Sequence, residues 1–227
     1  MSESTAPTPD HIQALRQQTL EVQVGEDVES ADSPPQEEIP LAKRSKLGAK
    51  LAAKKFVDDK DLKSLVKIDA IGRSAKQHQE ELLEIHARGD RDILCHAGNG
   101  FGPLDIDEVG LAYLASQLNK GLDMGGNPLE QTSFVIGIAG PAASTDADFF
   151  VSSPIFDIAQ LPKRDIPVIA TVWAIPDVRT AAYAIHERCA EIPEELLARI
   201  NKGEGEAVAQ EIAKALRKHV AGIREVN

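Results

Sequence analysis

The sequence predicts an α/β fold built on a mainly parallel sheet. Short runs rich in β-branched and aromatic residues alternate with longer segments whose apolar residues recur every three or four positions. This alternation is typical of parallel sheets whose strands are joined by helices. The chain has 227 residues, of which 42% are hydrophobic, so it can bury a sizeable core.

Six segments have the composition of strands: residues 65–70, 92–96, 134–139, 149–152, 168–173 and 220–223. Three others are predicted helices: residues 75–87, 106–120 and 205–219. In the second helix, for example, Leu111, Leu114, Ala115 and Leu118 follow the i, i+3, i+4, i+7 spacing of a single apolar stripe. Each helix therefore has one face suited to covering a sheet.

Glycine and proline support these boundaries. Gly121, Gly125, Gly126 and Pro128 interrupt the chain before the predicted strand at 134–139. Pro193 stands at a position where a helix can begin.

The first forty residues differ from the rest in charge and composition. They hold nine acidic residues and one basic residue, out of 36 and 25 in the chain, together with five prolines. Such a segment buries too little apolar surface to offset the entropy of ordering, so we expect a disordered acidic tail at 1–40 and a folded domain at 41–227. The remaining 27 acids and 24 bases nearly balance, which argues against nucleic acid as the main partner.

A basic segment follows the tail. Residues 43–55, KRSKLGAKLAAKK, carry six positive charges and place Leu47 and Leu51 one helical turn apart. One interpretation is a nuclear-import or nucleic-acid patch. We favour the other, a solvated basic helix leading into the first strand, because a run of charge usually marks a solvated helix face.

Cysteine usage and hydropathy suggest a cellular setting. Cys95 and Cys189 are far apart and form neither a disulfide framework nor a zinc motif, so we expect two reduced core thiols. The histidines lack metal-like clustering, and no metal site is predicted. Without an apolar run that could span a bilayer, the chain is expected to be soluble and cytoplasmic.

One long segment resembles a known family. Residues 107–140 read DEVGLAYLASQLNKGLDMGGNPLEQTSFVIGIAG and include the unusual run LNKGLDMGGNPL. This segment resembles the methylenetetrahydrofolate reductase family of FAD-linked oxidoreductase barrels, most closely the branch in which the reductase domain is fused to a homocysteine S-methyltransferase. Further similar runs are DADFFVSSPIFD and IPVIATVWAI downstream, with RDILCHAGNG and SKLGAKLAAKKFV upstream.

The resemblance implies a fold and a reaction. The implied fold is a TIM-barrel-like (β/α) barrel with FAD across the carboxyl ends of its strands. The implied activity is the reduction of 5,10-methylenetetrahydrofolate to 5-methyltetrahydrofolate, with NAD(P)H as the reductant that supplies the flavin.

The resemblance also assigns roles to individual positions, several with altered residues. The family's flavin-tuning Asp falls at Asn99, its pterin-binding Gln at Ser153 and its catalytic Glu, on the first strand, at Asp61. An amide at Asn99 keeps hydrogen bonds but removes the negative charge, and the serine is too short for a two-point amide contact. Phe156 is expected near the folate.

Further cofactor contacts are expected at two strand ends. The family's His-Leu-Thr strand end falls at Lys67–Asp69, and Gly98 is expected beside the flavin. Cys95 and His96 should point to opposite faces of their strand, leaving one for core packing and the other, His96, for the site. The glycines around Gly98 suit either a close approach of backbone to phosphate or a simple turn.

The spacing of the predicted strands departs from a complete barrel. Residues 141–146 leave room only for a turn where a parallel crossover needs a dozen or more residues. About six strands remain, so we expect an incomplete barrel that a homo-oligomer or a partner protein could complete. Two functions stay open: a flavin-dependent oxidoreductase of one-carbon metabolism, or a catalytically impaired relative acting as a folate- or flavin-binding or structural subunit.

Overall fold

A computed structural model describes residues 37–53, 57, 61–98, 102, 104–140, 144, 146–186 and 191–225, with no side-chain description for Asp61 and residues 219–225. All belong to one compact unit, Pro35–Asn227. Most of the predicted acidic tail lies outside the described residues, and so do Asn99 and Cys189.

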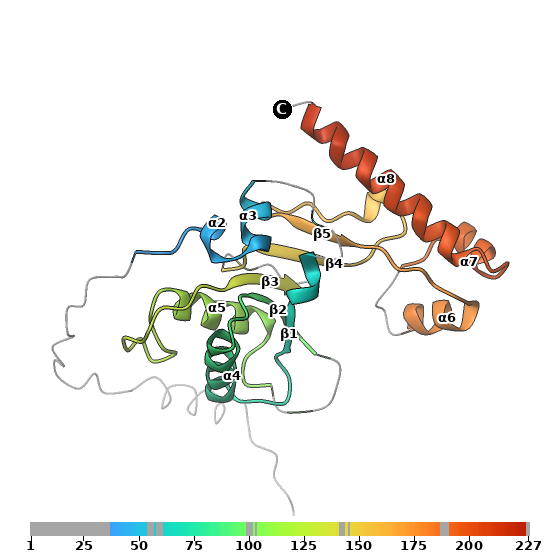
Figure 1. Cartoon of the computed structure of the whole chain (residues 1–227). Coiled ribbons are helices and arrows are strands. Elements are labelled where there is room, and N and C mark those ends of the chain that lie inside the picture. The colour runs from blue at the N-terminus through green and yellow to red at the C-terminus, as the bar shows by residue number, and fades with distance from the viewer. Residues whose placement is uncertain are drawn as a thin grey trace, which may run out of the picture. The chain divides into compact units, whose positions relative to one another are not determined.

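The described residues form an α/β fold on one parallel sheet of five strands, which confirms the predicted α/β class (Figure 1). The strands are β1 (Val66–Asp69), β2 (Asp92–His96), β3 (Val135–Ala139), β4 (Phe149–Pro154) and β5 (Val168–Thr171). They pair in sequence order, β1-β2-β3-β4-β5, and every pairing is parallel. The sheet is not closed, because β1 and β5 lie at its two edges.

The sixth predicted strand is wrong. Residues 220–223 belong to the long helix α8 (Gly205–Glu225), which was expected to end at 219. Val208, Ile212 and Leu216 are buried at helical spacing, and each added residue continues a helix that is already nucleated. This cooperative extension outweighs the local β preference of the short apolar run.

Helices α4 (Ala75–Ala87) and α5 (Glu108–Asn119) cover one face of the sheet, and both agree closely with the predicted segments (Figure 1). Side chains of Ser74 and Asp107 cap them by accepting backbone N–H bonds. Their apolar stripes join the sheet in a cluster with these members: Ile68, Leu82, Ile85, Ile93, Cys95, Leu111, Ala112, Leu114, Ala115, Leu118, Phe134 and Ile136. We call this side of the sheet the helix face.

The opposite face is covered by the basic segment. Helix α2 (Leu41–Arg44) leads into α3 (Lys46–Ala52), and Leu47 and Leu51 of α3 are buried against Val135 and Phe149. The predicted basic helix is present, but its leucines are buried in the core rather than solvated. Lysines such as Lys46 remain exposed on the outer side.

Close packing explains a glycine within this face. A Cβ on Gly137 of β3 would clash with the ring of Phe149 on β4. No larger residue fits beneath that ring without displacing it. The middle of this face is thus filled by an aromatic side chain.

The C-terminal helices form a separate core cluster. Helices α6 (Val178–His186), α7 (Glu194–Ile200) and α8 pack with η2 (Ile158–Gln160) and with residues that follow β5. The buried members are Phe156, Ile175, Ala181, Ala184, Ile200, Val208, Ile212 and Leu216. Helix α7 starts directly after Pro193, as predicted.

The connection between β3 and β4 is short. It spans nine residues, 140–148, and those that the structure describes include no helical residue. A short connection covers little of the helix face, so other side chains fill this part. The guanidinium of Arg164, for example, lies 4.6 Å from the centre of the Phe150 ring.

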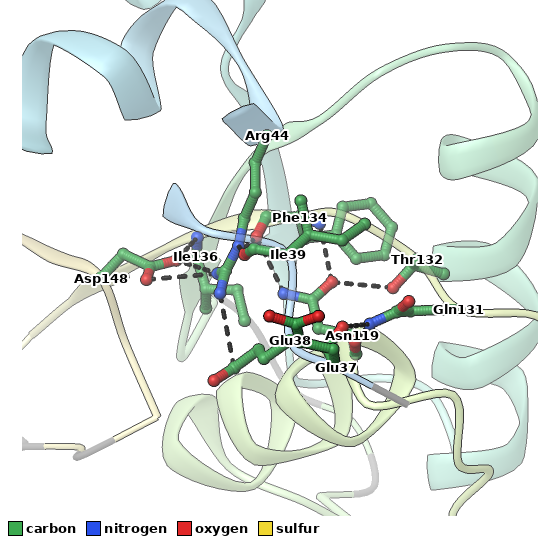
Figure 2. Close-up of polar contacts among 10 residues, drawn as sticks. All are labelled: Glu37, Glu38, Ile39, Arg44, Asn119, Gln131, Thr132, Phe134, Ile136 and Asp148. Atoms are coloured by element: carbon green, nitrogen blue, oxygen red, sulfur yellow. Dashed lines mark hydrogen bonds and ion pairs between the residues drawn. The ribbon is translucent and has the colours of Figure 1, made fainter. Parts of the chain in front are cut away.

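Polar groups tie the amino ends of the strands together (Figure 2). Asn119, 2% exposed at the end of α5, donates to the Phe134 carbonyl at 2.9 Å. Its side-chain oxygen accepts from the Phe134 N–H at 2.7 Å and from Thr132 Oγ1 at 2.8 Å. Asn119 belongs to the LNKGLDMGGNPL run, so this residue of the run has a structural role.

Arg44, at the end of α2, and Asp148, directly before β4, join this arrangement (Figure 2). Arg44 donates to the Phe134 carbonyl at 3.1 Å and to Asp148 Oδ2 at 3.2 Å, and its side chain is 8% exposed. Asp148 also accepts from the Ile136 N–H at 2.8 Å. We call Arg44, Asn119, Thr132 and Asp148 the amino-end network.

Candidate functional site

The carboxyl ends of β1 and β2 bring two predicted site residues together. Asp69 and His96 are paired in the parallel register, and Asp69 Oδ1 lies 3.1 Å from His96 Nδ1. Lys67 Nζ lies 3.1 Å from the same carboxylate oxygen. Asp69 and Lys67 are about half exposed, and His96 is 26% exposed. We call Lys67, Asp69, His96 and Gly98 the carboxyl-end cluster.

Strand alternation explains why these residues share a face. Ile68 and Cys95 are buried on the helix face, so their neighbours Asp69 and His96 point to the opposite side. The predicted division of roles between Cys95 and His96 is confirmed for packing, because Cys95 is fully buried.

Two groups compete for one nitrogen of His96. The Gly98 N–H lies 2.8 Å from His96 Nδ1, and the Asp69 carboxylate lies 3.1 Å from it. A ring nitrogen either carries a hydrogen, which it donates to Asp69, or has a lone pair, which accepts from Gly98. The two contacts are therefore alternatives, and the proton at Nδ1 selects between them.

Charge around Asp69 favours its ionised form. Partial burial acts to raise the pKa of Asp69, but the hydrogen bond and charge of Lys67, with a contribution from His96, lower it below the ordinary value of 3.8. Asp69 is therefore an anion at neutral pH, able to accept from a protonated Nδ1.

A buried histidine that was not predicted as a site residue, His78, contacts the backbone next to this cluster. His78 on α4 is fully buried, and its Nε2 lies 2.9 Å from the carbonyl of Ala70, the residue after Asp69. The Ala70 N–H donates in turn to the His96 carbonyl at 2.8 Å. His78 lies four residues before Leu82 on the apolar stripe, which is the signal that marks it as buried.

Gly98 has a conformational reason to be glycine. Its φ is +91°, and a Cβ there would lie 2.5 Å from Cγ2 of Ile71. The turn after β2 therefore brings backbone close to the turn after β1, with the Gly98 N–H beside His96.

Other predicted site residues lie elsewhere. Asp61 opens η1 (Asp61–Ser64), a 3-10 helix ahead of β1, rather than lying on a strand. Ser64 at the end of η1 donates to Asp92, the first residue of β2, so this helix belongs to the amino end of the sheet. The resemblance placed Asp61 in the site, and the structure puts its backbone at the amino end of the sheet, away from the end where Asp69 and His96 meet.

The two predicted folate contacts differ in surroundings. Ser153 is exposed on β4, whereas Phe156 is 3% exposed and belongs to the C-terminal core cluster. A ring buried in this way offers almost no surface to a substrate. The neighbouring Ser152 was not predicted as a site residue. Its hydroxyl accepts from the Thr171 N–H at 3.0 Å, where the β4–β5 register is irregular.

The thiol of Cys95 is not part of this chemistry. Burial, with the nearby charge of Glu108, raises the pKa of Cys95 far above its ordinary value. It is a free, buried cysteine. Among the described residues, no group of three or more His, Cys, Asp or Glu side chains could hold a metal ion.

No protein-family model matches this chain, and no curated protein matches it significantly. Within the part of the chain that the structure describes, no helix has the length and apolar character needed to cross a membrane.

Proposed function

We propose that this chain binds FAD and reduces 5,10-methylenetetrahydrofolate to 5-methyltetrahydrofolate with NAD(P)H, as a shortened and divergent relative of the methylenetetrahydrofolate reductases. The observation that carries the proposal is the meeting of Asp69 and His96 at the carboxyl ends of neighbouring parallel strands. Barrel enzymes build their sites at this end of the sheet.

Strand order supports the same proposal. Consecutive strands of a (β/α) barrel lie side by side in sequence order. In doubly wound sheets the order in which strands are added reverses at a switch point, although the strands stay parallel. The order β1-β2-β3-β4-β5 has no reversal. It suits five consecutive strands of such a barrel.

The polar groups at this end are compatible with a flavin. Flavin ring and phosphate oxygens need hydrogen-bond donors, and the Lys67 ammonium and Gly98 N–H are donors at the strand ends. When bound, FAD would supply the hydride chemistry, while these residues would bind and orient it. We further propose a cytoplasmic setting.

The visible absorption spectrum tests this function. The purified full chain should show flavin bands after incubation with FAD and desalting, and should then reduce methylenetetrahydrofolate. Lys67→Met should weaken FAD retention, whereas Lys63→Met, which removes an exposed lysine from η1 near the amino end, should not. Absence of flavin after reconstitution would reject the proposal.

A second candidate is a non-catalytic relative that binds folate or flavin, or acts as a structural subunit beside another chain. The open sheet favours it, since β1 and β5 both lie at sheet edges and edge strands are able to pair with further strands. A homo-oligomer or partner protein would then complete the barrel. Retained flavin without turnover, together with a mass in solution above that of one chain, would support this candidate.

A further inference from the structure

We propose that His96 is the proton-transfer residue of this site and that Asp69 orients it. This inference rests on the proposed function and concerns the proton that the reduction requires. Converting a methylene bridge to a methyl group forms one C–H bond and breaks one C–N bond. The hydride comes from the reduced cofactor, and the nitrogen that leaves keeps the bonding electron pair and must take a proton.

The described carboxyl-end cluster contains one group suited to supply that proton. The imidazole of His96 has two ring nitrogens, so one can give up a proton while the other keeps its hydrogen. The lowered pKa of Asp69 leaves that carboxylate without a proton to give, and the Lys67 ammonium is paired with Asp69. The two other positions expected to act in catalysis do not compete, because Asn99 has no acidic group and the backbone of Asp61 lies at the amino end of the sheet. His96 is also 26% exposed, so a ligand can reach it.

The contacts of the ring define the direction of transfer. In the imidazolium form, Nδ1–H donates to the Asp69 carboxylate 3.1 Å away, and Nε2–H is left to face the substrate. Nε2 gives its proton to the leaving nitrogen, and the neutral ring keeps Nδ1–H on Asp69. Water then returns a proton to Nε2.

Gly98 provides the competing arrangement. If the Gly98 N–H donates to His96 Nδ1, that nitrogen carries no hydrogen in the neutral ring. The hydrogen of the neutral ring is then on Nε2, and the proton that the imidazolium loses is the one on Nδ1. Proton transfer through Nε2 therefore requires that Nδ1–H donates to Asp69 and that Nδ1 does not accept from the Gly98 N–H. Among the described residues of the cluster, the charged groups facing His96 are Asp69 and, through Asp69, Lys67.

Nitrogen-15 NMR of the histidine rings in the full-length protein decides between the two arrangements. The His96 signals are assigned by their loss in His96→Gln and followed as the pH is raised. We expect the neutral ring to carry its proton on Nδ1, and Asp69→Asn to shift the population toward the Nε2–H tautomer. A wild-type neutral ring protonated on Nε2 would overturn the inference.

Kinetics supply the second measurement. In the flavin-loaded protein, His96→Gln should lower kcat by about a hundredfold or more and should abolish the loss of kcat on the high-pH side. His186→Gln, which changes an exposed histidine at the end of α6, is the matched control and should behave as wild type. Unchanged kcat in His96→Gln would overturn the role of His96.

The two measurements separate this inference from the proposed function. A wild-type chain without flavin or turnover would remove the reaction assigned to His96 and the proposed function together. A chain that binds flavin and turns over, but has the Nε2–H tautomer, would remove the Asp69–His96 mechanism alone.

Discussion

The two ends of the sheet use aspartate in opposite ways. Asp148, at the amino end, has a pKa raised above 3.8 because it is largely buried, in spite of the Ile136 N–H and Arg44. Asp69, at the carboxyl end, has a pKa lowered below 3.8, because the lysine and histidine beside it outweigh its slight burial. A buried network stabilises the fold at one end, while an exposed cluster keeps charge available at the other.

The difference gives opposite dependences on pH. The folded state binds the Asp148 proton more tightly than the unfolded chain does, so the contribution of Asp148 to stability falls as the pH rises through its raised pKa. Ionised Asp69 contributes stability above 3.8, and this contribution is lost as the pH falls through its lower folded pKa.

The largest effect is expected at Asn119. Asn119→Ala removes the partner of the Phe134 N–H, the Phe134 carbonyl and Thr132 Oγ1 in a buried position. Unsatisfied buried groups are costly, so we expect the free energy of unfolding in urea to fall by about 4 kcal/mol. Asn127→Ala, in the exposed loop of the same segment, is the control and should cost less than about 1 kcal/mol. Equal losses of stability in the two variants would contradict the conclusion that the amino-end network stabilises the fold.

A smaller loss is expected for Arg44→Met. The change leaves the largely buried Asp148 without its cation and should lower the free energy of unfolding by about 2–3 kcal/mol at pH 7. The loss should shrink as the pH is lowered toward the acid range, because Asp148 takes up a proton more readily once the cation is gone. Lys43→Met, on the exposed side of α2, should leave unfolding unchanged at neutral and at acid pH.

Asp69→Asn should have a smaller effect on stability, within about 0.5 kcal/mol at pH 7, since the carboxylate is 45% exposed. Urea unfolding at a series of pH values should show that the variant loses less stability on acidification than wild type does. A loss as large as that of Arg44→Met would show that the carboxyl-end cluster is also a structural element, and the comparison between the two ends would fail.

The smallest expected effect is at Cys95, next to His96 on β2. Its buried thiol should react with iodoacetamide at pH 8 at least about a hundredfold more slowly in the folded protein than in urea. Peptide mass spectrometry measures the modified fraction at this residue alone. Rapid labelling in the folded state would mean that Cys95 is accessible, and that β2 does not separate a buried Cys95 from an accessible His96.

Much of the fold was predictable from local pattern. Helix α4 and strand β2 match their predicted segments, because alternating burial and helical periodicity are properties of neighbouring residues. The same reasoning failed at residues 220–223, where the run is too short to distinguish a strand from a continuing helix. It also treated the leucines of α3 as part of a solvated helix, since the surface that buries them comes from β3 and β4.

The candidate site was predictable only in part. Lys67, Asp69, His96 and Gly98 were each expected to contact the cofactor, and the structure brings them together. His78 was not connected with the site because its partner, the Ala70 carbonyl, is a backbone group whose position depends on the turn after β1.

By itself, the sequence determined the α/β class, five of the strands and the segments that become the main helices, because periodicity and turn residues act over a few positions. Only the tertiary structure decided that Asp69 faces His96 and that Arg44 reaches Asp148. These residues are far apart in the chain, and their contacts depend on the strand register set by packing of the whole core.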